Sequence, residues 1–343
     1  MRAGTPTTRA RGTIARLDPP LKHMVRVAGG TFLMGSNDFY PEERPVHRVT
    51  VDGFWMDEHP VTNAEFRRFV EDTGYVTVAE RPPDPRDYPY ADTKLLVPGS
   101  LVFRPPPHRV ALHDFRAWWA YVPGVCWKHP ERPGCVVPGR DHHPVVHVAY
   151  EDAEAYAGWA GKALPTEAEW EFAARGGLAG AVFVWGDEFA PKGRLQANTW
   201  HGEFPWQNLK TDGYERTSPV GAFPANGYGL YDMAGNVWEW TSDLFRPRHP
   251  GEVASACCIP HNPRVEAAED GNVPDEHGSP FPHRVIKGGS HLCAPNYCFR
   301  YRPAARQGET IETSTSHIGF RCILRPPTEV AEGRTPSSRG GPR

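Results

Sequence analysis

Two cysteines near the end of the chain, Cys293 and Cys298, have the residue type and spacing most suggestive of chemistry. Four residues separate them, and Gly288-Gly289 lies just upstream, among aromatic residues and arginines. Such thiols can close a disulfide, hold one soft metal ion or attack a substrate. The structural alternatives are buried free cysteines, a structural disulfide or half of a zinc site, although no second pair of zinc ligands is apparent. Two soft thiolates also suit Cu(I), with room for a third thiolate from a substrate.

A second cluster offers oxygen ligands on what reads as a tight turn. Its members are Asp232, Gly235, Asn236 and Glu239. Hard oxygen donors on a turn are what Ca²⁺ prefers, and the alternative is an ordinary turn closed by Asx hydrogen bonds. Asn198 and Asp212 form a weaker set of the same kind. The sequence therefore leaves calcium binding and plain turn structure both open here.

Other candidate ligands have weaker patterns. His143 and His147 would share one face of a helix, but Pro144 and the neighbouring valines favour an extended segment. We therefore interpret these histidines as surface or hydrogen-bonded core residues. Four further cysteines are interpreted as structural or incidental: Cys126, Cys135, Cys257 and Cys258.

Composition excludes several classes of protein. The net charge is -3 and basic residues do not cluster, so neither nucleic acid nor an anionic membrane is expected as a partner. No apolar run of about 18 residues occurs, which argues against a transmembrane helix. The N-terminus lacks the apolar segment of a secretory signal, so a cytoplasmic location is expected. Seven cysteines, an odd number, argue against a disulfide framework.

The chain is expected to form one folded domain. Residues 1–21 are polar and rich in Pro and Arg, which predicts a flexible arm, and residues 327–343 predict a disordered tail. Residues 22–326 contain no repeat or linker. Thirty-four glycines, 37 prolines and 11 tryptophans favour a compact, loop-rich α+β domain with an aromatic core.

Local patterns predict a few short elements. Strands are expected over residues 24–28, 31–34 and 46–51, and helices over residues 62–74, 150–160 and 164–174. Gly29-Gly30 predicts a tight hairpin between the first two strands. Thr62 with Glu65, and Thr166 with Glu169, have the spacing of capping boxes at the start of two helices.

Taken together, these runs resemble the formylglycine-generating enzymes, also called sulfatase-modifying factors. The matching runs are 29–36, 60–63, 164–171, 197–205, 226–243, 288–290, 300–302 and 319–322. They occur in the family's order and cover almost all of residues 24–325. The most specific mark is the pair Cys293 and Cys298 with Ser290, Tyr297 and Arg300 around it.

The resemblance implies a fold and an activity. The family fold is a C-type-lectin-like α+β domain with little regular secondary structure. Its members use O₂ to oxidise the cysteine of a Cys-x-Pro-x-Arg segment in an unfolded type I sulfatase to Cα-formylglycine. The expected cofactors are Cu(I) and Ca²⁺, and an external thiol is the expected reductant. We expect a monomer.

The resemblance also assigns roles to single residues. Cys293 and Cys298 match the copper-binding catalytic pair, and Ser290 and Tyr297 match polar residues beside it. The first calcium set matches Asn198, Thr199, Asp212 and Tyr214, and the second matches Asp232, Gly235, Val237 and Glu239. Thr199, Tyr214, Gly235 and Val237 would contribute their carbonyl oxygens.

Some positions depart from the family pattern, and two other functions remain open. Ala157 and Pro303 stand where secretory members have extra cysteines, so Cys322 is expected to be free. His317 replaces an asparagine near the pocket of eukaryotic members. The alternatives are an iron-dependent enzyme of the same fold, such as a sulfoxide synthase, and a non-catalytic lectin-like binding module.

Overall fold

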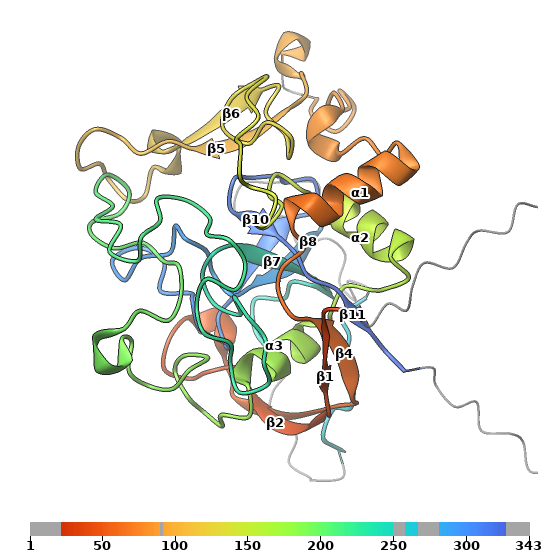
Figure 1. The fold of residues 1–343 in the computed structure, drawn as a ribbon, viewed down its shortest axis with the longest axis vertical. Helices are drawn as coiled ribbons and strands as arrows, with labels where there is room; N and C mark the ends of the chain where they lie inside the picture. The colour runs from red at the N-terminus through yellow and green to blue at the C-terminus, as the bar shows by residue number, and fades with distance from the viewer. Residues whose placement is uncertain (1–21, 90–91, 250–257, 267–280, 327–343) are drawn as a thin grey trace, which may run out of the picture.

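The structure is a computed structural model that describes residues 22–89, 92–249, 258–266 and 281–326. The expected arm over residues 1–21, the expected tail over residues 327–343 and Cys257 lie outside the described residues. Within them, short helices and strands are joined by long loops that pack into one body (Figure 1). None of these helices has both the length and the apolar character needed to cross a bilayer.

The three helices expected from the sequence are present. They are α1 (Asn63–Thr73), α2 (Tyr150–Trp159) and α3 (Glu167–Arg175). Both expected capping boxes form, because Thr62 accepts from the Glu65 amide while the Glu65 carboxylate accepts from the Thr62 amide, and Thr166 does the same with Glu169. Gly74 ends α1 in the left-handed conformation at φ 70°.

Four small sheets contain the strands of the described residues. The three-stranded sheet has the order β1 (Met24–Val27), β4 (Phe54–Asp57), β11 (Ile323–Leu324). The four-stranded sheet has the order β10 (Ile318–Gly319), β7 (Trp238–Leu244), β8 (His283–Lys287), β9 (Arg306–Thr310). Two-stranded sheets join β2 (Gly30–Met34) to β3 (His47–Val51) and β5 (Gly99–Phe103) to β6 (Trp119–Pro123). Only β10 and β7 among these pairs run parallel. Five 3₁₀ turns are described: Pro41–Glu43, Val78–Glu80, Thr93–Leu95, Phe115–Ala117 and Pro191–Gly193.

The expected hairpin at Gly29-Gly30 is wrong. Strand β1 pairs with β4, and β2 pairs with β3, so the two glycines carry the chain from one sheet to another. Gly29 has φ 75°, and a β-carbon there would lie 2.5 Å from the backbone of Asp52. These glycines therefore permit a close backbone crossing rather than a two-residue turn.

Helix α3 is buried along its whole length despite its charged residues. Its carboxylates are satisfied by cations from the strands: Glu167 by Arg306 at 2.7 Å and Glu171 by Lys287 at 3.1 Å. A buried carboxylate is tolerated only when it is paired in this way. These ion pairs fix the end of β8, from which the chain enters the cysteine loop.

The apolar core has two parts. The main cluster is built on aromatic side chains such as Trp170, Trp238 and Phe320, each at most 2 % exposed. A smaller cluster consists of Phe103, Trp118, Trp200, Phe204, Leu292 and Ala294. Because its last two members flank Cys293, this smaller cluster packs directly against the cysteine loop.

Candidate active site

The loop that carries the two cysteines begins at Gly288-Gly289, immediately after β8. Both glycines have positive φ, at 90° and 68°. A β-carbon at Gly288 would lie 3.0 Å from the Trp170 ring, and one at Gly289 would lie 2.9 Å from the Tyr301 amide. Glycine is required here because the backbone passes closely between the core and the returning chain.

Two consecutive turns bring the thiols together. The Cys293 amide donates to the Ser290 carbonyl at 2.9 Å, and the Cys298 amide donates to the Ala294 carbonyl at 2.8 Å. The two sulfur atoms lie 2.7 Å apart, and both cysteines are free. Their exposed fractions are 2 % and 8 %, so the pair is held almost out of solvent.

The two thiols have opposite electrostatic environments. Burial raises the pKa of the Cys293 thiol well above its ordinary value. The pKa of Cys298 is lowered, first by the hydrogen bond from Cys293 and, against its burial, by the adjacent Arg300 guanidinium. The pair therefore favours one proton on Cys293 and a thiolate at Cys298, which is the nucleophilic and metal-binding form.

Arg300 is held beside Cys298 by residues from the N-terminal part of the chain. Its guanidinium donates to the Glu42 carboxylate at 2.6 Å and lies 3.8 Å from the centroid of the Tyr40 ring. The Tyr40 hydroxyl accepts a hydrogen bond from the Phe299 amide at 2.9 Å. Sequence reasoning missed Glu42 and Tyr40, since nothing in their local pattern marks them as neighbours of a residue about 260 positions away.

Ser290 and Tyr297 lie beside the pair, as the resemblance implies. Ser290 is fully buried, and its amide donates to the Cys293 sulfur at 3.4 Å. The Tyr297 ring stacks on Phe204 with centroids 4.5 Å apart and meets Trp118 edge-on at 5.5 Å. Tyr297 is also 39 % exposed, so it joins the buried site to the surface.

Tyr301 is a further site residue that the sequence did not single out. Its side chain is fully buried, and its hydroxyl has no hydrogen-bond partner among the described residues. Burial, and then the charges on Cys293 and Cys298, raise the pKa of this hydroxyl. A buried, unpaired phenol beside two thiols is a polar group that a substrate or oxygen species can satisfy.

The donor set at the pair fits Cu(I). Two soft sulfur donors lie 2.7 Å apart and almost out of solvent, and this ligand type selects Cu(I) over hard cations. Among the described residues no three His, Cys, Asp or Glu side chains gather in a metal-binding arrangement, which leaves the pair without the extra protein ligands of a closed zinc site.

The first set of expected calcium ligands converges. The Asp212 carboxylate accepts from the backbone amides of Thr199 and Tyr214, each at 3.1 Å. Asn198 is buried next to Thr199, and its side chain donates to the Arg216 carbonyl. Burial raises the pKa of Asp212, against the lowering effect of His201 at 3.7 Å. A buried carboxylate held between two of the other expected ligands suits Ca²⁺.

The second expected set is only partly free for a metal. Both oxygens of Glu239 accept from Arg321, at 2.7 and 2.8 Å, and one also accepts from Trp170. Asp232 accepts from the Gly221 amide at 2.8 Å, and burial raises its pKa. Because Arg321 neutralises Glu239, Asp232 holds the charge that a cation at this loop would balance.

The two loops that carry the expected calcium ligands touch each other and the cysteine loop. The Asn236 amide donates to the Asn198 carbonyl at 2.9 Å, and a β-carbon at Gly235 would lie 2.2 Å from that same oxygen. His291 donates its backbone amide to the Asn236 carbonyl, and its ring Nδ1 bonds the same oxygen at 2.8 Å. The predicted oxygen sites therefore support the loop that carries the thiols.

The remaining candidates from the sequence are structural. His147 lies outside any helix, with Nδ1 bonded to Ser100 at 2.7 Å and Nε2 bonded to the Pro130 carbonyl at 2.8 Å. Cys126 and Cys135 are both free, as is the fully buried Cys322. The interpretation of His147 as a hydrogen-bonded core histidine and the expectation for Cys322 are confirmed.

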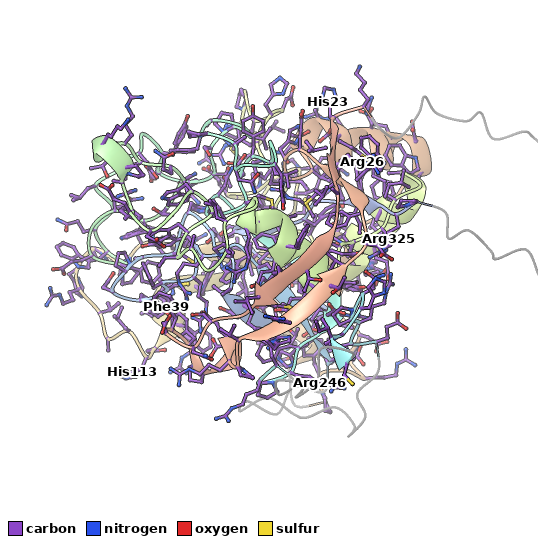
Figure 2. All side chains as sticks on the ribbon, turned by 90° about the horizontal axis from the view of Figure 1, so that it is seen from below. His23, Arg26, Phe39, His113, Arg246 and Arg325 are labelled. Carbon is purple, nitrogen blue, oxygen red and sulfur yellow. The ribbon has the colours of Figure 1, made fainter. Side chains whose placement is uncertain are left out.

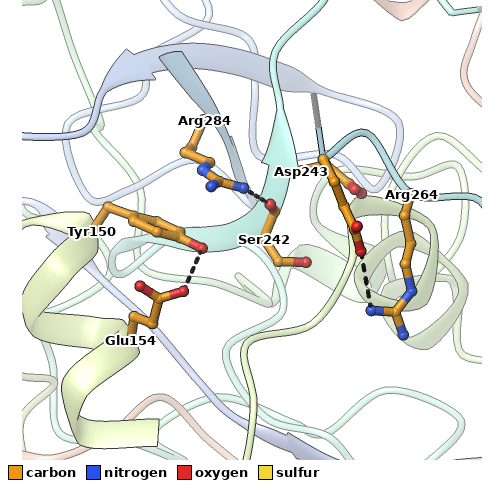
Figure 3. Close-up of a pocket in the computed structure, with 7 residues that line it drawn as sticks. Tyr150, Glu154, Ser242, Asp243, Arg264 and Arg284 are labelled. Atoms are coloured by element: carbon orange, nitrogen blue, oxygen red, sulfur yellow. Dashed lines mark hydrogen bonds and ion pairs between the residues drawn. The ribbon is translucent and has the colours of Figure 1, made fainter. Parts of the chain in front are cut away.

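Two cavities lie away from the cysteines. One, of about 220 Å³, lies between α2 and the β7–β8 pair, where Tyr150 donates to Glu154 at 3.3 Å and Arg284 donates to the Ser242 carbonyl (Figure 3). The other, of about 460 Å³, includes Arg26 and Arg325, which lie on the same side of the molecule (Figure 2). Neither is lined by a residue of the thiol pair.

The fold and the site define a lectin-like α+β domain built around a buried pair of free thiols. Residues 11–326 match the domain described as the sulfatase-modifying factor enzyme 1-like domain. The chain is 54% identical over 307 residues to a protein of Mycobacterium tuberculosis named formylglycine-generating enzyme, covering 89% of this chain and 99% of that one. The chain belongs to the sulfatase-modifying factor family.

Two further comparisons concern the activity and the fold. A protein of Bos taurus named inactive C-alpha-formylglycine-generating enzyme 2 is 37% identical over 316 residues, covering 90% of this chain and 91% of its own. The solved structure of PvdO from Pseudomonas aeruginosa has a TM-score of 0.57 at 24% identity, covering 88% of this chain and 93% of that one. The expected fold is confirmed, whereas activity has to be argued from the site.

Proposed function

We propose that this protein is a copper-dependent oxidase that uses O₂ to convert the cysteine of a Cys-x-Pro-x-Arg segment in type I sulfatases to Cα-formylglycine. One observation carries the proposal: two buried, free sulfur atoms lie 2.7 Å apart in a member of the sulfatase-modifying factor family. The name of the Mycobacterium tuberculosis relative supports the same reaction.

Cys293 and Cys298 would hold the metal. When bound, Cu(I) supplies the redox chemistry with O₂ that thiols alone perform poorly. Arg300 favours the thiolate at Cys298, and burial of both sulfurs keeps competing water away. The substrate cysteine approaches past Tyr297, which lies beside the pair and is partly exposed to solvent. Ser290 and Tyr297 are placed to hold the substrate or oxygen species.

The reaction requires a second electron donor. Oxidation of the substrate's CH₂–SH carbon to the thioaldehyde level releases two electrons, and hydrolysis then exchanges H₂S for the aldehyde oxygen. Complete reduction of O₂ to water takes four electrons, so an external thiol must supply the other two. We therefore propose a thiol reductant as a partner, and an unfolded chain as substrate because the target cysteine has to reach a buried pair. We also propose that the protein acts as a monomer in the cytoplasm, where it would meet both the thiol reductant and the unfolded substrate chain.

Calcium is proposed as a structural ion. Asn198, Thr199, Asp212 and Tyr214 would form one site, with Asp212 as the buried acid that lacks a close cation. Asp232, Gly235, Val237 and Glu239 would form the other. Because the first loop bonds Cys293 through Trp200 and the second bonds His291 through Asn236, bound Ca²⁺ would hold the pair in place rather than take part in oxidation.

Mass spectrometry of a Cys-x-Pro-x-Arg peptide tests the reaction. The peptide is incubated with the protein, Cu(I), a thiol and air, and a product in which oxygen replaces H₂S is expected. Cys298→Ser should abolish it, whereas Cys322→Ser should not, since Cys322 is also buried and free but lies in the main apolar cluster, away from the pair. Turnover by the Cys298→Ser chain would refute the assignment. Activity that follows iron rather than copper would favour the iron-dependent alternative.

A further inference from the structure

A small cavity lies directly behind the cysteine loop. It has a volume of about 180 Å³ and is walled on the loop side by Trp200 and His291. His291 precedes Cys293 by two residues, so their Cα atoms are at most about 7 Å apart. The Trp200 amide also donates to the Cys293 carbonyl at 3.0 Å. A group bound in this cavity would therefore lie close to the backbone of the loop that carries Cys293.

The cavity wall contains a donor without a partner. Trp200 is only 3 % exposed, and its indole Nε1 has no hydrogen-bond partner among the described residues. The ring is fixed by edge-on contacts with Phe103 at 5.6 Å and Phe204 at 5.3 Å, so it cannot easily turn toward solvent. A buried N–H in this state is stabilised by any ligand that brings an acceptor to it.

The charges at the cavity leave an excess of one cation. Lys210 at the mouth is neutralised by Glu215 at 2.5 Å. Arg216, which also lines the cavity, shares the single carboxylate of Glu131 with Arg140, at 3.6 Å and 2.9 Å respectively. Because Glu131 is closer to Arg140, Arg216 is the cation available to a ligand. A cavity lined by an arginine and by a residue with a desolvated, unpaired N–H is a favourable site for a carboxylate.

We propose that this cavity binds the acidic side chain of a residue close to the target cysteine in the peptide substrate. The volume accommodates one side chain rather than a folded partner, and an extended peptide places side chains about 7 Å apart along one face. The arginine of the Cys-x-Pro-x-Arg segment would be repelled by Arg216, so the cavity binds a different residue of the substrate. This inference rests on the proposed function, because it takes a peptide as the natural ligand.

Binding is measured first with small probes, which separates the cavity from turnover. The copper-free protein is labelled at its tryptophan indoles, and the resonance lost in Trp200→Phe identifies the Nε1–H signal. N-acetyl-glutamate methylamide should shift this resonance, and the uncharged glutamine analogue should bind about tenfold more weakly, as expected when a charged hydrogen bond is lost. Equal binding of both probes, or no shift with either, would overturn the carboxylate site.

Two arginine variants provide a matched comparison. Arg216→Gln removes the cation that lines the cavity and keeps the backbone carbonyl that Asn198 uses. The control, Arg81→Gln, breaks an exposed pair with Glu151 and does not line the cavity. The first change should weaken binding of the acidic probe about tenfold, and the second should leave it within about twofold. Equal losses would mean that the general charge of the protein, not this cavity, attracts the probe.

Peptides then distinguish a substrate side chain from a free small carboxylate. Unreactive Ser-x-Pro-x-Arg peptides carry Glu or Gln at each variable or flanking position in turn, and affinity is read from the Trp200 resonance. One Glu register should bind about tenfold more tightly than its Gln counterpart, with the gain lost in Arg216→Gln. If the small probe binds but no peptide register gains, the cavity is not a substrate subsite. These outcomes stand whether or not the Cys-containing peptide is oxidised.

Discussion

The backbone amide of Trp200 donates a hydrogen bond to the carbonyl of Cys293 across 3.0 Å. Trp200 follows directly after Asn198 and Thr199, so this bond ties the first predicted calcium loop to the first thiol. A second tie runs from His291 to the Asn236 carbonyl in the other calcium loop. The position of the cysteine pair therefore depends on two loops that have little regular secondary structure of their own.

Removal of calcium should loosen this arrangement. We expect a chelator to lower the Tm by several degrees and to weaken Cu(I) binding, because a ligand that binds only the folded state stabilises it. The change Asp212→Asn should reduce this response, since it neutralises the buried acid of the first loop and leaves the second loop intact. Thermal unfolding and Cu(I) titration, each with and without chelator, check this.

The control for Asp212 is an exposed acid. Asp141 pairs with Arg67 at the surface, and Asp141→Asn should leave the response to chelator unchanged. A wild-type Tm that is the same with and without chelator would contradict a stabilising calcium.

Gly289→Ala should disturb the thiol pair more than its backbone strain alone explains. Gly289 has φ 68°, and a β-carbon there would lie 2.9 Å from the Tyr301 amide. Gly180 has a nearly identical φ of 70° with no atom within 4 Å of its β-carbon position, so Gly180→Ala measures the strain by itself. We expect Gly180→Ala to cost about 1–2 kcal/mol of unfolding free energy, and Gly289→Ala about 1–3 kcal/mol more. Denaturant unfolding measures both, and equal losses would show that the contact with Tyr301 is unimportant.

The local signals in the sequence predicted local structure well. Thr62, Thr166 and Gly74 mark helix ends in the positions where the structure has them, since a cap is decided within about four residues. Gly29-Gly30 was misread because a positive φ serves a tight turn and a chain crossing equally well. The four sheets pair strands that are distant in sequence, and no local pattern specifies those partners.

The site was predictable from the sequence only where its residues lie close together in the chain. Cys293, Cys298, Ser290 and Tyr297 come from one short segment, and their spacing with the family resemblance places them together. Residues that support the site from elsewhere in the chain were missed, since Glu42 and Tyr40 show their role only when the fold brings Arg300 to them. Tyr301 was missed for another reason: the sequence gives no sign that its hydroxyl is left unpaired.

The buried pair Arg302–Glu43 should be a major source of stability at the site. Both side chains are at most 1 % exposed, and Arg302 donates to Glu43 at 2.9 Å while lying 3.7 Å from the Phe39 ring centroid. Arg302→Met should cost about 3–5 kcal/mol, because it leaves the Glu43 carboxylate buried without a partner. Arg86→Met, which breaks an exposed pair with Asp84, should have no measurable effect. Denaturant unfolding compares them, and a small loss in Arg302→Met would mean that Glu43 finds another partner.

Arg300 should control the pH at which Cys298 loses its proton. The pKa of Cys298 is lowered in the folded chain, so the thiolate adds stability that is fully present above the thiol's unfolded pKa and is lost as the pH falls through the folded pKa. Arg300→Met should raise the pKa of the Cys298 thiol in the folded chain, because it removes the cation. Arg300→Lys should keep most of the lowering of this pKa. Thiolate absorbance in the copper-free protein, followed from acid to alkaline pH, reports the titration directly.

The variant Cys298→Ser assigns the signal. It should remove the low-pH part of the absorbance change, because the remaining Cys293 thiol is buried and its pKa is raised. A titration that is the same with Met and Arg at position 300 would show that the hydrogen bond from Cys293 alone sets the pKa of Cys298.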